Sequence, residues 1–527
     1  MSWPFAGYST RNDLYRNPSS AMSYYKRLWY LLLISTVAKL LIGGLVELGN
    51  DEVYYYTYAL RPDWSYFDHP PLVGWLIRLS TLNLHWVSTW TMRLGPILCC
   101  AISTFFIFVT GKTIGNEKTG WYAALIYQCA VYTGIIAGLF ILPDSPQMPF
   151  WTGALCLMAR LMTSKDDNRT KNWLLLGLMI GLATLSKVHG LYLWAGFGLF
   201  ILFKRREWLR RWQLYAAFAV TLVCLIPIVY WNIQNHFITY TYHSARVTHT
   251  IIQWDSLLRE VVGEMIYQNP IVFVLLVIGL IFLVRRKNNF ASTDMRVWLL
   301  CMSLPMILLF WGVALFNPTL PHWSGPAYIP LFFGAAFWLS SRSKKIIRTV
   351  VGWAGSLVVF FLVVAISLCR WAPFNLGSQE QRNYGEYCPT LDLSGWNDFG
   401  KRFAQLVHDD LISGKMKPNV PLLVSKWFPG GHLQFYVAPK ACMRILGIGE
   451  LEDLHEFAWL NKERAPLRVG DDAYYVVPSN VPADPAVLYG KYFSRFEAPV
   501  TINQVRGGKT VRYFWVYRLR GCRVVPE

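Results

Sequence analysis

Charge is scarce in this chain, and acidic charge is the scarcest. Only 15% of the 527 residues are charged, whereas about 25% is usual for a soluble protein. The 31 Asp and Glu residues are outnumbered by 50 Lys and Arg, which gives a formal net charge of +19, and 54% of the chain is hydrophobic. This composition argues against a soluble globular protein and favours a membrane protein.

Several other features are missing. No cysteine spacing resembles a zinc site, and no internal repeat or low-complexity segment is present. The first 27 residues contain no apolar stretch before a small-residue cleavage site, so we expect no cleavable signal peptide. Three cysteines, Cys388, Cys442 and Cys522, lie in the polar C-terminal part. If that part is extracytoplasmic, one disulfide is feasible, with its pairing left open.

The excess of basic residues is a topology signal. Nucleic-acid binding would need a basic face, but here the Lys and Arg residues form short clusters between apolar runs, as in cytoplasmic loops of membrane proteins. The clusters are Lys26–Arg27, Lys165–Lys171, Lys204–Arg211, Arg285–Lys287 and Arg342–Arg348. We therefore expect no nucleic-acid partner and a cytoplasmic N-terminal tail at residues 1–27.

Apolar runs long enough to cross a bilayer core of about 30 Å recur between residues 28 and 369. They predict a polytopic α-helical domain with about eleven transmembrane helices. The expected limits are 28–46, 90–110, 119–138, 146–162, 173–187, 189–203, 213–231, 269–284, 297–315, 325–340 and 350–369. The fifth and sixth are short and meet near Ser186–Gly190. An odd number places the C-terminus outside.

The composition changes after Arg370. The last 158 residues hold 16 of the 31 acidic residues. Alternating runs at 473–477 and 512–519 predict strands, and 396–413 predicts an amphipathic helix. We therefore predict that residues 370–527 form a soluble, extracytoplasmic α/β domain of ordinary size.

The first external loop, residues 47–89, is the richest in chemistry. A carboxylate pair, Asp51-Glu52, and an acid–imidazole pair, Asp68-His69, follow the first apolar run, together with a tyrosine run and several tryptophans. Acids at the exit of a membrane helix are costly to place, so they suggest function. The aromatic residues predict helices lying in the membrane interface. The plainer alternatives are a helix cap for the acids and packing for the tyrosines.

Ionisable residues from five loops are expected at this same external boundary. They are Asp51, Glu52, Asp68, His69, Asp144, Lys187, His189, His243, Arg246, His249 and His322. Cations suit an anionic phosphate leaving group, and a carboxylate suits general-base catalysis on an attacking hydroxyl. Several of them have plainer explanations: a snorkelling Lys187, a turn residue at Asp144, an ion pair of Arg246 within its own loop, and a local hydrogen-bonded pair of Asp68 with His69 that fixes the turn into Pro70-Pro71.

A series of motifs in this order resembles one family. The motifs are Asp51-Glu52-Val53-Tyr54-Tyr55, Phe67-Asp68-His69-Pro70-Pro71-Leu72, Pro143-Asp144-Ser145-Pro146, Leu185-Ser186-Lys187-Val188-His189, Trp231-Asn232 through Arg246, and Pro321-His322-Trp323. They resemble bacterial GT-C glycosyltransferases related to protein O-mannosyltransferases and the lipid A aminoarabinose transferase, over about residues 25–340. The resemblance implies a GT-C fold with a transmembrane catalytic domain at residues 28–369.

The resemblance also implies roles. The catalytic positions are Asp51, Glu52 and Asp144, and a divalent cation could bind between Asp51 and Asp144. The donor-phosphate positions are His69, Lys187, Arg246 and His243. The substrate cavity would add Asp68, Tyr54, Tyr55, His189, His322 and Trp323. His69 stands where the aminoarabinose transferase has a lysine, and an imidazole is charged only part of the time near pH 7. The resemblance therefore does not predict which sugar is transferred.

The implied activity is inverting transfer of a sugar from a polyprenyl-phosphate donor to a lipid, glycan or protein acceptor. It would take place at the extracytoplasmic face of a bacterial inner membrane, among membrane lipids. A lipid or glycan transporter or flippase is the alternative, but it predicts internal repeats and acids near mid-membrane. A non-enzymatic anchor for the C-terminal domain would not explain polar residues converging from five loops.

Overall fold

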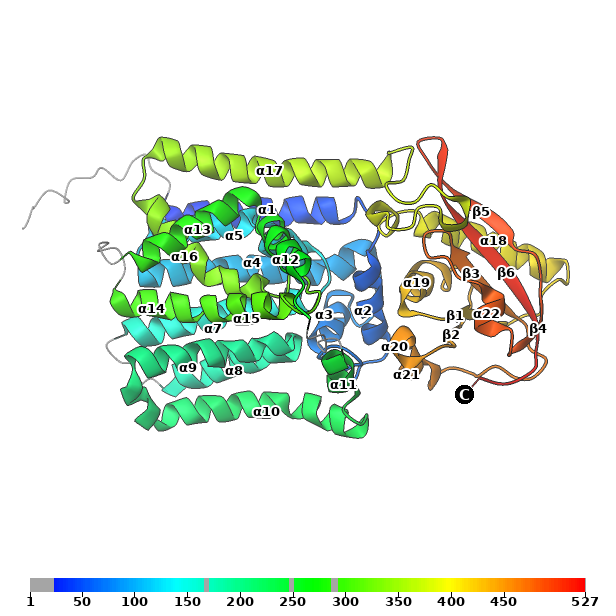
Figure 1. Ribbon diagram of the computed structural model, residues 1–527, viewed down its shortest axis with the longest axis horizontal. Helices are drawn as coiled ribbons and strands as arrows, with labels where there is room; N and C mark the ends of the chain where they lie inside the picture. Colours follow the sequence, from blue (N-terminus) through cyan, green and yellow to red (C-terminus); the bar gives the residue numbers. More distant parts are fainter. Residues whose placement is uncertain (1–22, 165–169, 246–250, 286–291, 527) are drawn as a thin grey trace, which may run out of the picture.

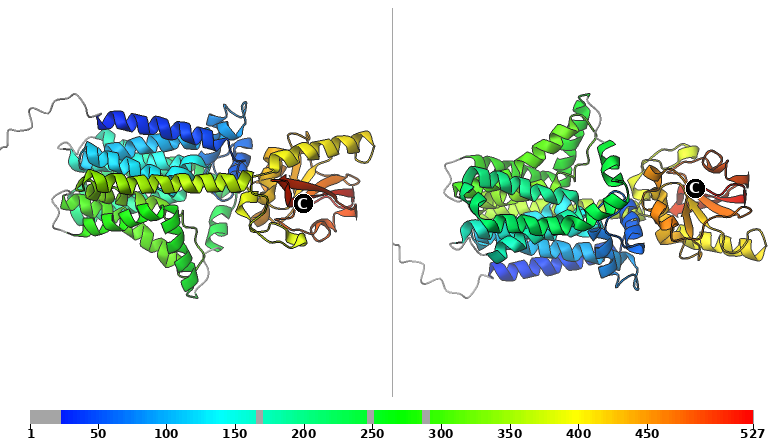
Figure 2. Two further views of the ribbon diagram at one scale, coloured as in Figure 1. Left: turned by 90° about the horizontal axis from the view of Figure 1, so that it is seen from above. Right: turned by 90° about the horizontal axis from the view of Figure 1, so that it is seen from below.

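The computed structural model describes residues 23–164, 170–245, 251–285 and 292–526. A bundle of roughly parallel helices forms one half of the molecule, and an α/β domain lies beyond one end of the bundle (Figure 1). The views from above and below show the same separation (Figure 2). Arg246 and His249 lie outside the described residues.

Helices occupy all eleven intervals that the sequence predicts as spans. In chain order they are α1 (Tyr24–Gly43), α4 (Thr89–Ile114), α5 (Glu117–Cys129) with η1 (Tyr132–Ile136) and α6 (Ala137–Leu139), α7 (Asp144–Thr163), α8 (Thr170–Ser186), α9 (Tyr192–Lys204), α10 (Trp212–Gln234), α13 (Pro270–Val284), α14 (Thr293–Cys301) with α15 (Leu304–Ala314), η4 (Gly325–Tyr328) with α16 (Ile329–Ser340), and α17 (Lys344–Arg370). Helices α8 and α9 meet at η2 (Val188–Leu191), as predicted.

Length and composition alone single out fewer membrane helices. Among the described residues, four helical segments are long and apolar enough to cross a membrane: α4, α10, α14–α15 and α17. Two bent pairs raise the number to six. One pair is α5 with the η1–α6 segment, bent by 74°, and the other is α12 (Trp254–Tyr267) with α13, bent by 101°. The protein is therefore a multi-pass membrane protein.

The bend before α13 has a local cause. Asn269 has a left-handed backbone, with φ at 69°, and its side chain accepts a hydrogen bond from the Ile271 amide. Pro270 follows at the first helical position, where its missing N–H is tolerated. The Asn269 amide also donates to the carbonyls of Cys129 and Ala354. The turn is thus tied to two other helices of the bundle.

The segment predicted as the first external loop, residues 47–89, contains the expected helices. Helix α2 (Asn50–Leu60) runs across the end of the bundle (Figure 1), and α3 (Leu72–Ser80) packs against α2 and α4. Between the bundle and this loop, α11 (Ile238–Ala245) follows α10.

The C-terminal domain is built on one mixed sheet in the order β2-β1-β3-β6-β4, with β5 also paired to β6. Strand β1 pairs in parallel with β2 and β3, and β6 is antiparallel to β3, β4 and β5. The strands are β1 (Leu422–Val424), β2 (Ile445–Gly447), β3 (Ala473–Pro478), β4 (Phe493–Phe496), β5 (Val500–Arg506) and β6 (Lys509–Cys522). The helices are α18 (Trp396–Ile412), α19 (Trp427–His432), η7 (Leu433–Val437), α20 (Leu451–Leu454), α21 (Phe457–Asn461) and α22 (Pro485–Tyr489).

The predicted α/β domain, its helix at 396–413 and both predicted strands are therefore present. The disulfide that the sequence leaves open is absent. All ten cysteines lie in described residues and are free thiols, and only Cys442 is exposed.

The C-terminal domain is docked onto α2. Glu47, just before α2, accepts hydrogen bonds from the Trp396 and Asn397 amides at 2.7 and 3.1 Å, which caps α18. The His432 ring lies 2.8 Å from the Asn50 side-chain oxygen. Buried side chains of α2 and of the C-terminal domain pack into a single apolar cluster. The domain therefore covers the outer side of the first external loop.

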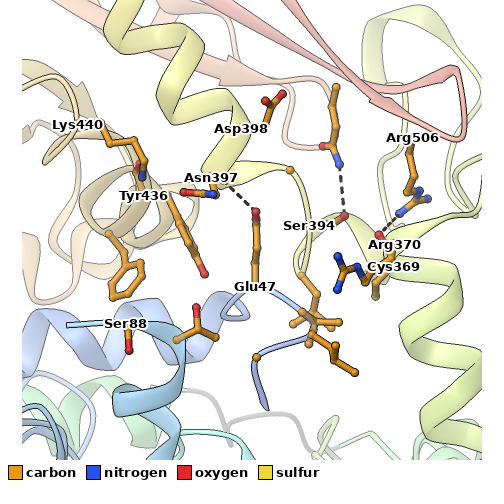
Figure 3. Close-up of a pocket in the computed structure, with 18 of the residues that line it drawn as sticks. Glu47, Ser88, Cys369, Arg370, Ser394, Asn397, Asp398, Tyr436, Lys440 and Arg506 are labelled. Atoms are coloured by element: carbon orange, nitrogen blue, oxygen red, sulfur yellow. Dashed lines mark hydrogen bonds between the residues drawn. The ribbon is translucent and has the colours of Figure 1, made fainter. Parts of the chain in front are cut away.

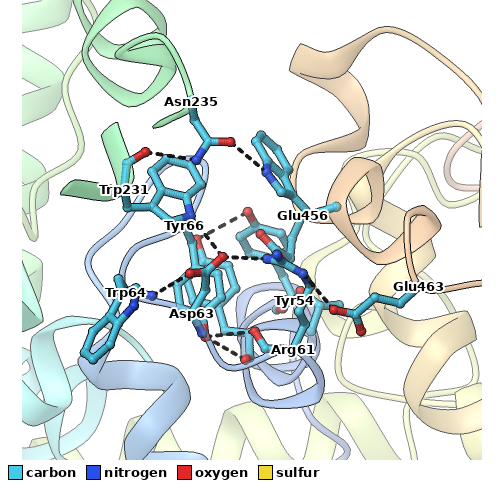
Figure 4. Close-up of polar contacts among 12 residues, drawn as sticks. Tyr54, Arg61, Asp63, Trp64, Tyr66, Trp231, Asn235, Glu456 and Glu463 are labelled. Carbon is cyan, nitrogen blue, oxygen red and sulfur yellow. Dashed lines mark hydrogen bonds and ion pairs between the residues drawn. The ribbon is translucent and has the colours of Figure 1, made fainter. Parts of the chain in front are cut away.

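A second contact joins the loop after α2 to α21. Arg61 bonds Asp63 at 2.7 Å and Glu463 at 3.0 Å, and it lies 3.8 Å from the buried Glu456 (Figure 4). Asp63 also accepts a hydrogen bond from the indole of Trp231, at the end of α10. Three parts of the chain that are distant in sequence are thus held together at this corner.

Candidate active site

Helix α2 has two chemically distinct sides. Successive residues of an α-helix are rotated by about 100°, so Asp51, Tyr54, Tyr55 and Tyr58 lie along one side, while Glu52 and Tyr56 lie along another. The first side faces Asp68 and His69, because the Tyr54 and Tyr58 hydroxyls donate to Asp68 and the Tyr55 ring lies 5.8 Å from the His69 ring. This side forms one wall of the candidate site.

Glu52 makes structural contacts in the framework of the site, and its catalytic role stays a prediction. Its carboxylate is buried and receives two hydrogen bonds from the buried guanidinium of Arg93, at 2.8 and 2.5 Å. The Gly49 amide donates to it at 2.8 Å and the Ile141 amide at 3.2 Å. Both oxygens are therefore satisfied by the protein, and Glu52 locks α2 against α4.

Asp51 is the open carboxylate of the site. Among the described residues it has no hydrogen-bond or ion-pair partner. Protein atoms surround it, yet its side chain remains accessible to solvent. Burial raises the pKa of Asp51 to about 6, with a further contribution from the negative charges of Asp68 and Glu52. A carboxyl group with such a pKa suits general-base chemistry near neutral pH.

Asp68 and His69 lie beside this wall. Burial by itself would raise the pKa of Asp68, but His69, His455 and the hydrogen bonds from Tyr58 and Tyr54 together lower it. Burial lowers the pKa of His69 to about 4, against the opposing effect of Asp68. His69 is therefore neutral at pH 7. In this state it can donate one hydrogen bond to a phosphate oxygen but supplies no charge, whereas the sequence suggested a partly charged imidazole.

Asp144 and Lys187 form a buried ion pair. The Lys187 ammonium lies 3.0 and 2.9 Å from the two carboxylate oxygens of Asp144, and the Tyr132 hydroxyl donates to the same carboxylate at 2.7 Å. Asp144 begins α7, and Lys187 follows the last residue of α8. Lys187 is thus aimed into the site by Asp144 and does not snorkel to the membrane surface. One N–H of the ammonium remains for a substrate oxygen.

Three more predicted residues of the site come from two other segments: His189, His322 and Trp323. Both histidines interact electrostatically with Lys187 and with each other. Burial lowers the pKa of His322 to about 4, so its imidazole is neutral at pH 7. The rings of His189 and Trp323 both pack on Phe310, at centroid distances of 5.3 and 6.2 Å. Two loops from different parts of the bundle therefore meet at Lys187.

His243 completes the cluster on the side of the first loop. Its ring lies 6.1 Å from that of His69, and its Nε2 is 2.8 Å from the main-chain oxygen of Asp68. The predicted donor-phosphate residues His69, Lys187 and His243 are thus brought to one region. Arg246, the fourth, lies outside the described residues.

The described residues do not fit the divalent cation that the resemblance allows between Asp51 and Asp144. Both oxygens of Asp144 already contact the Lys187 ammonium. Across residues 23–164, 170–245, 251–285 and 292–526, no group of three Asp, Glu, His or Cys side chains has the arrangement of a metal site. We therefore derive no step through a metal ion.

Two residues near the site, Arg93 and His455, are not among those predicted from the sequence. Arg93 is a cation inside a predicted span, and that signal alone predicts a buried partner or a function. His455 belongs to the C-terminal domain, and no pattern in the sequence places it here. Its ring lies 5.5 Å from that of Tyr54 and 4.6 Å from that of Phe67, and its Nε2 is 3.3 Å from the Tyr242 hydroxyl.

Comparisons with known proteins relate the chain to glycosyltransferases. Residues 68–231 match the family described as dolichyl-phosphate-mannose-protein mannosyltransferase. The lipid A galacturonosyltransferase RgtD of Rhizobium johnstonii is 25% identical over 283 residues. That alignment covers 53% of this chain and 58% of RgtD, so it spans a little over half of the relative.

The fold resembles that of ArnT from Cupriavidus metallidurans. The apo structure of ArnT has a TM-score of 0.62 and 12% identity, and the structure bound to undecaprenyl phosphate has 0.60 and 14%. Each comparison covers 94% of this chain and 98% of ArnT, so both the bundle and the C-terminal domain are shared. The chain thus shares the fold of ArnT, and its residues 68–231 resemble the protein mannosyltransferase family.

Proposed function

We propose that this protein is an inverting glycosyltransferase that moves a sugar from a polyprenyl-phosphate donor to a lipid acceptor. The observation that carries the proposal is the contrast among the acids of the site. Glu52 and Asp144 are held by Arg93 and Lys187, and Asp68 by two tyrosines, whereas Asp51 is open and has a pKa of about 6. Asp51 is thus the acid available for proton transfer.

The reaction then follows from the positions of the side chains. Asp51 takes the proton of an acceptor hydroxyl as its oxygen bonds to the anomeric carbon. The bond between that carbon and the phosphate oxygen breaks, and its electron pair leaves with the polyprenyl phosphate. Attack opposite the leaving phosphate inverts the anomeric configuration.

The basic side of the site receives the phosphate. Lys187 supplies a positive charge, and His69 supplies a ring N–H group as a hydrogen-bond donor. His243 lies beside His69, with its Nε2–H donated to the main-chain oxygen of Asp68. By resemblance, Arg246 would join them. Because Asp144 positions Lys187 before the substrate arrives, no reorganisation is needed when the negative charge develops on the departing phosphate.

The relatives support the substrate classes. ArnT has been solved with undecaprenyl phosphate, a polyprenyl phosphate, and RgtD is named for sugar transfer to lipid A. A lipid acceptor is therefore favoured over a glycan or a protein. The helices that fill the eleven predicted spans support a topology with a cytoplasmic N-terminus. The site and the C-terminal domain would then face the periplasm at a bacterial inner membrane.

The test uses the full-length protein in lipid nanodiscs, with a polyprenyl-phosphate sugar as donor and lipid A as acceptor. Free polyprenyl phosphate should be released only when acceptor is present, and Asp51→Asn should abolish the release. Asp409→Asn, which removes an exposed carboxylate of α18 outside the candidate active site, is the matched control. Activity with nucleotide sugars alone would refute the donor class. Movement of donor across the bilayer without any sugar transfer would favour the flippase alternative.

A further inference from the structure

A second polar groove lies on the other side of α2 from Asp51. It has a volume of about 780 Å³ and separates the end of the bundle from the C-terminal domain (Figure 3). Tyr56 lines it, on the side of α2 that also carries Glu52. The ends of α1 and α17 and the start of α4 form its membrane-facing wall, and α18 and η7 form the other. The groove is therefore separate from the candidate active site.

The groove lies at the level of the membrane surface. Trp86, Trp90 and Trp371, next in sequence to its lining residues, are each at least 60% exposed. Exposed tryptophans gather at the boundary between lipid headgroups and acyl chains. Below this level, α17 is almost entirely uncovered by protein, since only 6% of its most apolar stretch is buried.

The charges in the groove favour an anion. Its lining carries three cations, Arg370, Lys440 and Arg506, and two acids, Glu47 and Asp398. Glu47 is held by two backbone amides of α18, and Asp398 pairs with Arg402 at 3.0 Å. Within the described ranges, neither Arg370 nor Lys440 has a carboxylate within salt-bridge distance.

The position of Arg370 is set by its neighbours. Arg506 donates to the carbonyls of Cys369, Ala372 and Phe374, which ties the end of α17 to β5. Arg370 then stands on one side of the groove and Lys440 on the opposite side, with Glu47 between them (Figure 3). Leu45, Val46 and Val87 line the apolar part of the groove.

We propose that this groove binds the phosphate-bearing headgroup of a membrane lipid. Arg370 and Lys440 contact the headgroup from opposite sides, while Leu45, Val46 and Val87 meet the beginning of the acyl chains. The chains then continue along the exposed aliphatic side chains of α1 and α17, such as Leu41 and Val364. The bound lipid would fill the space between the bundle and the C-terminal domain.

The test is a titration of the full-length protein in detergent with phosphatidylglycerol, followed by native mass spectrometry. Each cation near a lipid phosphate contributes roughly 1 kcal/mol, so Arg370→Gln with Lys440→Gln should weaken the tightest site by about 10- to 30-fold. Arg382→Gln with Lys491→Gln removes the same charge elsewhere on the C-terminal domain and should leave the affinity unchanged. Asp398→Asn should tighten binding.

Three results would overturn the proposal. The first is equal weakening in the two double variants, which would mean attraction by net charge. The second is no weakening in the groove variant. The third is displacement of the lipid by inorganic phosphate at the same concentration, which would identify a site for the free ion.

Discussion

Asp51 and Glu52 are adjacent in the sequence, but their carboxylates lie on different sides of helix α2 and make different contacts. Glu52 is buried against Arg93. The negative charges of Asp68 and Asp144 contribute to the raised pKa of Asp51. The rotation of about 100° between successive helical residues accounts for this difference. One acid therefore fixes the helix, and the other remains free to react.

Replacing Asp51 with Asn should abolish turnover without harming the fold. A general base commonly contributes a factor of about 10² to 10⁴, so kcat should fall by at least about 100-fold. Because Asp51 makes no ion pair with a described residue, its replacement should leave the melting temperature unchanged or raise it slightly. Steady-state kinetics and a melting curve on the same preparation would check both. Normal kcat would exclude Asp51 as the base.

Replacing Glu52 with Gln should give the opposite pattern. Arg93 would keep its buried charge without the carboxylate that balances it, and such losses destabilise by about 3–5 kcal/mol. The melting temperature of Glu52→Gln should be well below that of the wild type. The double variant Glu52→Met with Arg93→Met, which removes both charges, should recover part of the stability. A stable Glu52→Gln protein with no turnover would instead return Glu52 to the catalytic residues.

Much of the fold could be predicted because apolar run length is a local signal. The intervals 119–138 and 325–340 are helical almost to the residue, and alternation located β3 and β6. The pairing of Glu52 with Arg93, 41 residues later, could not be predicted from the sequence because it depends on how two helices pack. The neutral state of His69 was missed for a similar reason, since burial is set by segments far away in the sequence.

The rate should rise with pH through about 6. Asp51 must be ionised to accept a proton, and burial sets its pKa at about 6, so kcat should increase roughly tenfold between pH 5 and 7. His69 and His322, with pKa values of about 4, stay neutral over this range. The folded pKa of Asp51 lies above its ordinary value, so its ionisation lowers stability as pH rises from about 4 to 6.

Single-turnover rates measured at a series of pH values from 5 to 8 would locate this rise in rate. The residual rate of Asp51→Asn should not show it. A wild-type profile that is flat from pH 5 to 7 would mean that ionisation of Asp51 does not limit the reaction.

Asp144 and Lys187 should behave as one unit. Lys187→Met leaves the buried Asp144 carboxylate with Tyr132 alone and should cost about 3–5 kcal/mol. Asp144→Asn strands the ammonium in the same way. In a double-mutant cycle, the combined variant should lose clearly less stability than the sum of the two single losses. Additive losses would show that the two residues do not depend on each other.

His455 offers a sharper test, because its backbone is strained. Its φ of 50° and ψ of −129° fall in a region that essentially only glycine tolerates, and such strain is typical of functional positions. His455→Gly should therefore be more stable than His455→Ala by about 1 kcal/mol or more, the reverse of the usual order. Both variants lose the contacts with Tyr54 and Phe67, next to Asp68, so the KM for the donor should rise in both. His408→Ala, at an exposed position of α18, is the matched control and should change neither quantity. If His455→Ala kept the wild-type KM, the C-terminal domain would have no part in shaping the donor side of the site.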